Sequence, residues 1–135
     1  MIAIIDYGVG NLFSLASSLK SLGLETKVTR DAAAIRAADH IILPGVGAFT
    51  DAMAKLEATG LVPVIKQEVE HKPLLGICLG MQLLFEKSYE YGEHTGLGLI
   101  PGEVCPLADD LKDPSLKVPH IGCAGRYRRI FRGGT

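Results

Sequence analysis

The feature that most constrains the fold is a short apolar run that stops at a glycine-rich turn and is followed by a helix-like segment. Residues 2–5 (Ile-Ala-Ile-Ile) are wholly apolar, which is typical of a strand buried on both faces of a parallel sheet. After the turn at 6–11, leucines recur every three or four residues up to Gly23, a residue type that commonly ends a helix. The first part of the sequence therefore predicts a strand–turn–helix unit.

The same alternation continues along the chain. Further strands are predicted at 25–29, 40–43 and 74–77, with a weaker one of antiparallel type at 97–104. Helices are predicted at 31–38, from a cap at Thr50 or Asp51 through 58, at 63–70 and at 79–86, and a loop at 105–122. This order predicts an α/β fold with a doubly wound, mostly parallel sheet and helices on both faces. Functional residues are then expected in the turns beyond the carboxyl ends of the strands.

Composition and charge exclude several classes of protein. The 135 residues carry 14 Lys and Arg against 15 Asp and Glu, so no overall field favours nucleic acid or a membrane surface. The opening apolar run is too short for a signal peptide, and no run approaches the roughly 20 apolar residues of a membrane span. Cys78, Cys105 and Cys123 lie far apart without zinc-ligand spacing. We therefore expect a cytoplasmic protein with no metal site, membrane contact or nucleic-acid partner.

The strongest chemical motif is Gly-Ile-Cys-Leu-Gly at 76–80, where a predicted strand turns into a helix. A nucleophile elbow needs glycines on both sides, because the strand and the helix approach too closely there for side chains. The helix N-terminus behind the cysteine favours the thiolate, which is the nucleophilic form. We therefore predict that Cys78 is a nucleophile; the alternative is a buried cysteine in a core strand.

A second glycine-rich turn, Pro44-Gly45-Val46-Gly47, follows another predicted strand. Backbone N–H groups of such a turn can stabilise a developing oxyanion, and each donor is worth about 3 kcal/mol in a transition state. Gly45, Val46 and Gly47 are therefore candidate oxyanion-hole residues beside the elbow. The alternative is an ordinary turn at the end of a strand.

The glycines at 8 and 10 invite a dinucleotide-binding interpretation, which fails. Phe13 occupies the third glycine position, and no acidic residue lies at the end of the second predicted strand. A phosphate-binding Walker loop is also absent from the sequence. We therefore predict no cofactor.

A cysteine that attacks an amide needs a histidine to protonate the leaving amine. His40, His71, His94 and His120 each lack a carboxylate two residues later, and the first three are expected at a strand start, a helix end and a surface loop. No general base is visible. Two carboxylates, Glu86 and Glu90, follow the elbow helix, where one could meet a substrate ammonium group; a solvated helix end is the alternative.

Four stretches together carry a family resemblance. The segment Gly76-Ile77-Cys78-Leu79-Gly80-Met81-Gln82 resembles the nucleophile elbow of class I (triad) glutamine amidotransferases. The segments 6–12 (Asp-Tyr-Gly-Val-Gly-Asn-Leu), 44–49 (Pro-Gly-Val-Gly-Ala-Phe) and 119–122 (Pro-His-Ile-Gly) resemble the family of glutaminase subunits of imidazole glycerol phosphate synthase, from histidine biosynthesis.

The resemblance implies a mechanism and a partner. Cys78 would attack the side-chain amide of L-glutamine, form a glutamyl thioester and release ammonia, which passes to a (β/α)8-barrel cyclase subunit in a heterodimer. The N–H of Leu79 and a donor from Gly45 to Gly47 would form the oxyanion hole. Gln82 and Glu90, matched by their offsets from Cys78, would hold the glutamine. Asn11 matches a position at the interface with the cyclase.

The resemblance runs from residue 1 to Gly122 and stops there. The 13 residues 123–135 include four arginines and no acidic residue, which leaves 10 basic against 15 acidic side chains before them. We therefore expect residues 1–122 to be the N-terminal part of a truncated amidotransferase domain and residues 123–135 to be an irregular tail outside the family, created by a shifted or prematurely ended reading frame.

The expected truncation affects activity, because family members place the catalytic His and Glu beyond this point. This chain is then predicted to turn over little glutamine. The alternatives are a catalytically inactive module that binds the cyclase, and another triad amidotransferase such as the glutaminase of the pyridoxal phosphate pathway. The Pro-Gly-Val-Gly turn disfavours the latter.

Overall fold

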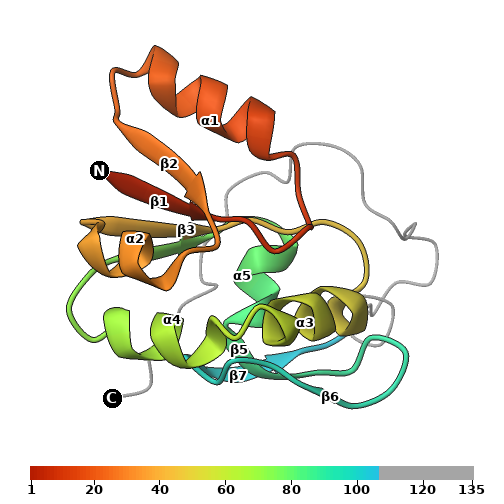
Figure 1. The fold of residues 1–135 in the computed structure, drawn as a ribbon. Helices are drawn as coiled ribbons and strands as arrows, with labels where there is room; N and C mark the ends of the chain where they lie inside the picture. The colour runs from red at the N-terminus through yellow and green to blue at the C-terminus, as the bar shows by residue number, and fades with distance from the viewer. Residues whose placement is uncertain (107–135) are drawn as a thin grey trace, which may run out of the picture.

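A four-stranded parallel sheet forms the centre of the protein (Figure 1). The computed structural model describes residues 1–106. The strands β1 (Ile2–Ile5), β2 (Thr26–Thr29), β3 (His40–Leu43) and β4 (Leu74–Gly76) lie in the order β2-β1-β3-β4, and all neighbouring pairs are parallel. The predicted α/β fold with a mostly parallel sheet is therefore confirmed.

Helices cover the two faces of this sheet unequally. The helix α1 (Leu12–Ser21) lies on one side, and α2 (Ala32–Ala37), α3 (Phe49–Ala58) and α4 (Val62–Glu68) lie on the other (Figure 1). The short helix α5 (Leu79–Leu83) follows β4 directly. No helix in residues 1–106 is long and apolar enough to cross a membrane.

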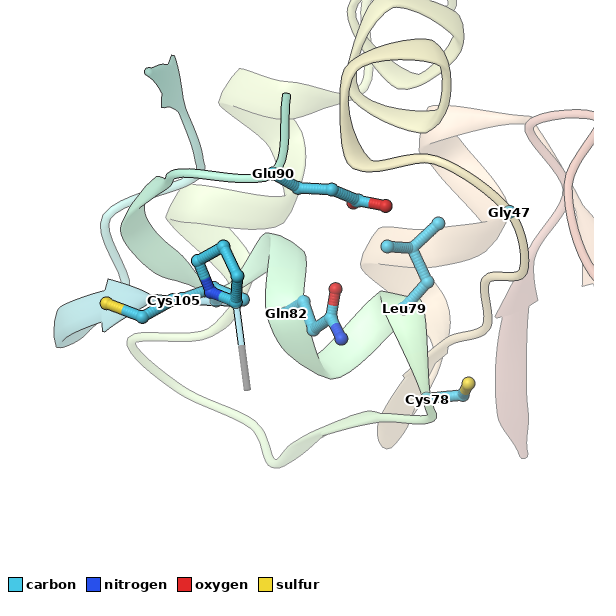
Figure 2. A pocket seen from close by; sticks show the side chains of 8 residues that line it. Gly47, Cys78, Leu79, Gln82, Glu90 and Cys105 are labelled. Atoms are coloured by element: carbon cyan, nitrogen blue, oxygen red, sulfur yellow. The ribbon is translucent and has the colours of Figure 1, made fainter. Parts of the chain in front are cut away.

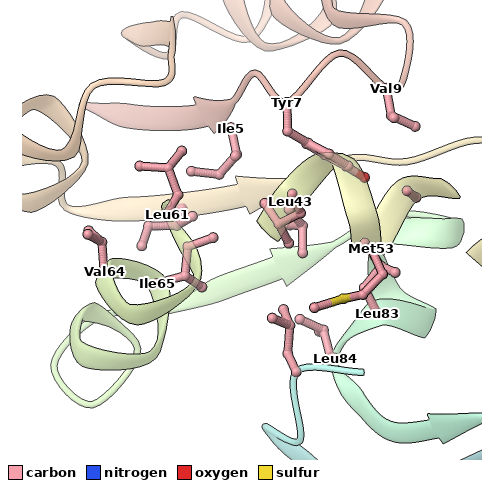
Figure 3. Close-up of a cluster of buried hydrophobic side chains, with 14 of the residues drawn as sticks. Ile5, Tyr7, Val9, Leu43, Met53, Leu61, Val64, Ile65, Leu83 and Leu84 are labelled. Carbon is pink, nitrogen blue, oxygen red and sulfur yellow. The ribbon is translucent and has the colours of Figure 1, made fainter. Parts of the chain in front are cut away.

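The main hydrophobic core lies between the sheet and helices α2 to α5. Alternate strand residues such as Ile5 and Leu43 point into it, as the two-residue repeat of a strand requires (Figure 3). They pack against Ile35 of α2, Leu56 of α3 and Ile65 of α4, all of which are fully buried. Each such side chain contributes roughly 1.5–3 kcal/mol through burial. Helix α1 supplies no fully buried residue.

The C-terminal end of α1 agrees with the prediction, and the N-terminal end of α3 does not. Helix α1 ends at Ser21 and is followed, after Leu22, by a left-handed Gly23 (φ 77°). The Gly23 N–H donates to the Lys20 carbonyl, as predicted for a glycine stop. The predicted cap of the next long helix at Thr50 or Asp51 is wrong, because α3 already begins at Phe49. Its N-cap, Ala48, has no side-chain acceptor to offer.

The largest difference from the sequence prediction is a second sheet of three short strands. The helix predicted at 79–86 ends at Leu83, and residues 85–88 form β5 (Phe85–Ser88). The helix cannot continue, because the carbonyls of Leu83 and Leu84 accept hydrogen bonds from residues 97, 99 and 100 instead of from the next helical turn. Glu86 therefore lies on a strand and not at a helix end.

Strand β5 is the middle strand of this sheet. It pairs antiparallel with β6 (His94–Thr95) and parallel with β7 (Ile100–Val104). The antiparallel strand predicted at 97–104 is thus shorter than expected and parallel to its neighbour. Most of the loop predicted at 105–122, the motif at 119–122 with His120, and the tail at 123–135 with Cys123 lie outside the described residues, and the proposed domain boundary at Gly122 stays a prediction.

Candidate active site

Cys78 stands at a sharp turn between β4 and α5, and its side chain is exposed. Its backbone angles, φ 56° and ψ −119°, fall in a region that side chains other than glycine rarely adopt. The strand–turn–helix arrangement predicted for residues 76–80 is present. A nucleophile in this position is held out from the sheet edge, where a substrate can reach the sulfur.

The two glycines that flank the cysteine are required by contact distances. A Cβ at Gly76 would lie 2.6 Å from the Cα of Met81, and one at Gly80 would overlap the carbonyl oxygen of Leu43 on the neighbouring strand. Either side chain would push α5 away from the sheet. The close strand–helix approach inferred from the sequence is therefore confirmed.

A cavity of about 280 Å³ lies beside Cys78 and gathers most of the predicted site residues (Figure 2). Its lining consists of Gly47, Cys78, Leu79, Gln82, Glu90, Val104, Cys105 and Pro106. The side chains of Gln82 and Glu90 extend into the space that Cys78 borders (Figure 2). Gly45 and Val46 belong to the same turn as Gly47 but do not line the cavity.

Val104, Cys105 and Pro106 are lining residues that the sequence did not indicate. They reach the cavity because β7 pairs with β5, a pairing that no local pattern reveals. In Figure 2 the sulfurs of Cys78 and Cys105 lie at opposite sides of the view and point away from each other.

Glu90 links the cavity to the start of α3. Its carboxylate accepts a hydrogen bond of 3.1 Å from the N–H of Phe49, the first residue of that helix. The Glu90 backbone N–H donates in turn to the hydroxyl of Ser88, which is fully buried. A carboxylate at a helix N-terminus is favourable both as an acceptor and through the helix dipole. Glu90 therefore supplies the cap that Ala48 lacks, and it is not the end of a solvated helix.

The turn at residues 44–47 rests directly on the elbow. The carbonyl oxygen of Gly45 accepts a hydrogen bond of 3.2 Å from the N–H of Leu79, the predicted oxyanion donor. A Cβ at Gly45 would lie 2.7 Å from the Gly80 nitrogen, so only glycine allows this approach. The Leu79 N–H can reach a ligand oxygen only after the Gly45 carbonyl has turned away. That carbonyl belongs to the peptide joined to Val46, whose side chain is exposed.

The histidines of residues 1–106 lie away from the cavity. The exposed His40 starts β3, and His71 follows α4, as predicted. His94 lies on β6 and not in a loop, with its ring Nε2 3.1 Å from the carbonyl oxygen of Tyr91. Since none of the three lines the cavity, no histidine in this part of the chain is placed to serve Cys78.

Asn11 has a structural role that the sequence did not assign. Its side chain caps α1 by accepting a hydrogen bond of 3.2 Å from the N–H of Ser14. The residue is exposed and lies outside the cavity, so its predicted contact with a partner subunit stays a prediction. Within residues 1–106, no group of three His, Cys, Asp or Glu side chains is placed to hold a metal ion.

The fold and the elbow define the class of protein, and the comparison with known families agrees. The chain belongs to the glutamine amidotransferase class-I family, which it matches over residues 3–130. The resemblance predicted from the elbow is confirmed.

Individual relatives narrow the comparison. The chain is 50% identical over 132 residues to the imidazole glycerol phosphate synthase subunit HisH of Sulfurimonas denitrificans, covering 97% of this chain and 62% of that protein. The same subunit of Aquifex aeolicus is 53% identical over 121 residues (88% and 56%), and that of Moorella thermoacetica 54% identical over 137 residues (98% and 63%). The chain thus spans about three fifths of the length of these relatives.

Solved structures show the same fold. A crystal structure of a glutamine amidotransferase matches with a TM-score of 0.66 at 24% identity, over 78% of this chain and 56% of that one. A putative peptidase E protein from Listeria monocytogenes matches with a TM-score of 0.59 at 18% identity, over 73% and 62%. At these identities the likeness concerns the fold alone.

Proposed function

We propose that this chain carries the glutaminase site of an imidazole glycerol phosphate synthase. The observation that carries the proposal is a single cavity lined by the exposed Cys78 together with Gln82 and Glu90. The choice among glutamine amidotransferases rests on identities of 50% to 54% to the HisH subunits, together with the Pro-Gly-Val-Gly turn at 44–47.

The cavity suits an amino acid with an amide side chain. L-Glutamine would place its side-chain amide carbon at the Sγ of Cys78 and its ammonium group at Glu90. One oxygen of that carboxylate already accepts from Phe49, and no donor among residues 1–106 bonds to the second oxygen, which can accept from the ammonium group. The side-chain amide of Gln82, which also lines the cavity, offers the substrate a hydrogen-bond donor and an acceptor.

The reaction proceeds through a thioester. The Cys78 thiolate adds to the amide carbon, and the carbonyl oxygen takes up the negative charge, which the Leu79 N–H and a donor from Gly45, Val46 or Gly47 stabilise. The C–N bond then breaks, the nitrogen takes a proton and leaves as ammonia, and the glutamyl group stays on sulfur. Water hydrolyses the thioester to glutamate and restores the thiol. The proton donor has no assigned residue within 1–106.

The proposal includes a partner and a location. The ammonia would pass to the cyclase subunit of a heterodimeric synthase in histidine biosynthesis, with Asn11 at the contact between subunits. A cytoplasmic location agrees with the three widely spaced cysteines of the sequence.

Thioester capture tests the proposal directly. The purified chain is mixed with L-glutamine, alone and with a cyclase subunit, quenched in acid and analysed by intact mass. We expect a small fraction of a species heavier by one glutamyl group, because no proton donor is assigned within residues 1–106. The species should be absent from Cys78→Ser and from samples given L-asparagine. L-Glutamine should also slow alkylation of Cys78 by iodoacetamide, read by peptide mass spectrometry. Absence of both the adduct and the protection would contradict the proposal.

A further inference from the structure

Tyr7 is a buried polar residue that no step of the proposed reaction uses. It lies in the loop after β1 and is 3% exposed. Its side chain descends from this loop toward Leu43 and Met53 in the main core (Figure 3). Its hydroxyl donates a short hydrogen bond to the carbonyl oxygen of Pro44, 37 residues away in the sequence.

The same hydroxyl touches the next residue of the turn. A Cβ at Gly45 would lie 2.7 Å from the Tyr7 oxygen, so the hydroxyl packs against the Gly45 Cα as well as holding the Pro44 carbonyl. One residue further along, the Gly45 carbonyl oxygen engages the Leu79 N–H. Tyr7 thus fixes the peptide immediately before the one that must turn to free that N–H.

The chemistry of the phenol limits what it can do there. Burial raises the pKa of Tyr7 to about 12, so the hydroxyl is neutral and keeps its proton throughout the ordinary pH range. It is therefore a constant donor to a carbonyl, and it is not an acid, base or nucleophile at neutral pH.

We propose that Tyr7 is a positioning residue for the oxyanion hole, which anchors the Pro44–Gly45 peptide while the following peptide turns toward the substrate. This inference rests on the proposed glutaminase function. The fixed φ of Pro44 and the hydrogen bond from Tyr7 hold the Pro44–Gly45 peptide in place. The rotation that exposes the Leu79 N–H is therefore confined to the next peptide, between Gly45 and Val46. Without the anchor, the turn loses the preorganisation on which oxyanion stabilisation depends.

The test separates oxyanion binding from ground-state binding in the full chain. L-Glutamate γ-semialdehyde is an aldehyde analogue of glutamine; its carbonyl carbon forms a C–S bond with Cys78, and its oxygen takes the thiol proton or remains an oxyanion. L-Glutamate binds without forming a bond. Each ligand is titrated for its ability to protect Cys78 from iodoacetamide, whose displacement reaction needs no oxyanion hole.

Tyr7→Phe removes the hydroxyl and keeps the ring. We expect the semialdehyde concentration that gives half-protection to rise about tenfold, the effect of one lost hydrogen bond, while the concentration for L-glutamate stays the same. The unprotected alkylation rate of Cys78 should also stay the same. Tyr89→Phe is the matched control, because that hydroxyl bonds at 3.2 Å to Glu103 at an exposed site, and it should change neither concentration.

The remaining outcomes overturn the inference in distinguishable ways. An unchanged semialdehyde value in Tyr7→Phe shows that the hydroxyl does not serve the oxyanion hole. Equal weakening of both ligands, or loss of the folded state by circular dichroism, shows a purely structural role. Failure of both ligands to protect the parent chain overturns the proposed function itself, and the inference with it.

Discussion

Cys78 adopts a conformation that only a glycine would occupy without strain. Gly76 and Gly80 on either side of it cannot be replaced without a clash, because a Cβ at either position would overlap neighbouring atoms. The strain at a position such as Cys78 is on the order of 1–3 kcal/mol. It is maintained because the strand before it is paired with β3 and the helix after it packs in the core. At the scale of single residues, the conformation that exposes the Cys78 sulfur therefore lowers the free energy of unfolding. Substitutions that relieve this strain should stabilise the protein, and substitutions that add a clash should destabilise it.

Replacing Cys78 by glycine should stabilise the chain relative to alanine at the same position. Glycine tolerates φ 56°, whereas alanine keeps the strain, and we expect a difference of about 1 kcal/mol after the extra unfolded-state entropy of glycine is included. Urea unfolding of Cys78→Gly and Cys78→Ala measures it. Ala33→Gly, at an exposed helical position, is the control and should destabilise by about 1 kcal/mol. Equal stability of the two Cys78 variants would show that the elbow is unstrained.

Gly80→Ala tests the contact between the elbow helix and β3. Its new methyl group would overlap the Leu43 carbonyl oxygen, so the helix must shift, and we expect a loss of at least about 2 kcal/mol together with slower alkylation of Cys78. Gly60→Ala is the matched control, since Gly60 has a positive φ of 72° but nothing within 4 Å of an added Cβ. It should lose only about 1 kcal/mol and leave alkylation unchanged. Similar losses in both variants would falsify the steric explanation.

At the scale of elements, the cavity depends on contacts between segments far apart in the sequence. Glu90 follows β5 and caps α3, while the turn after β3 rests on α5. These contacts tie the second sheet to the main one at the place where the cavity forms. Helix α3 begins without a side-chain cap of its own, so the position of its first turn depends on Glu90, which lines the cavity.

Substitutions at Glu90 should separate its two roles. Glu90→Gln keeps an acceptor for the Phe49 N–H and should cost less than about 0.5 kcal/mol, whereas Glu90→Ala removes the cap and should cost about 1 kcal/mol. Both variants should lose protection of Cys78 by L-glutamine, because neither carries a charge for the ammonium group. Glu93→Ala, which breaks only an exposed pair with Lys87, should leave protection intact. Full protection in Glu90→Gln would remove Glu90 from the substrate site.

The sequence predicted those parts of the fold that local patterns determine. The four strands of the main sheet agree with their predicted bounds within two residues at each end. For β1 and β3 the reason is a buried apolar run, whereas the exposed β2 is found through the alternation of strands and helices. Strand β5 is not predicted, because residues 79–86 have the pattern of one helix. The helix ends early because the carbonyls of Leu83 and Leu84 accept hydrogen bonds from residues more than ten positions away. The bond from Tyr7 to Pro44 and the cavity contact of Cys105 were missed for the same reason: both depend on tertiary packing.

At the scale of the whole molecule, the two faces of the main sheet are covered unequally. Val28, Ile4, Ile42 and Leu75 form one row across the face that carries α1, because the parallel register pairs them in that order. The central residues of the row are buried, but Val28 is 40% exposed and Leu75 56% exposed. Leu75 lies on β4, which has β3 as its only paired strand among residues 1–106. An exposed apolar side chain on an edge strand favours association between chains.

Leu75→Thr should therefore reduce self-association at little cost in stability. Threonine has a β-branched side chain suited to a strand, and a half-exposed leucine contributes only about 1 kcal/mol through burial. We expect a smaller apparent mass in concentrated samples by light scattering and a melting temperature within a few degrees of the parent. Ile42→Thr, in the same row but 4% exposed, should instead cost about 2–4 kcal/mol. If Leu75→Thr leaves association unchanged, this edge of the sheet is not the surface through which the chains meet.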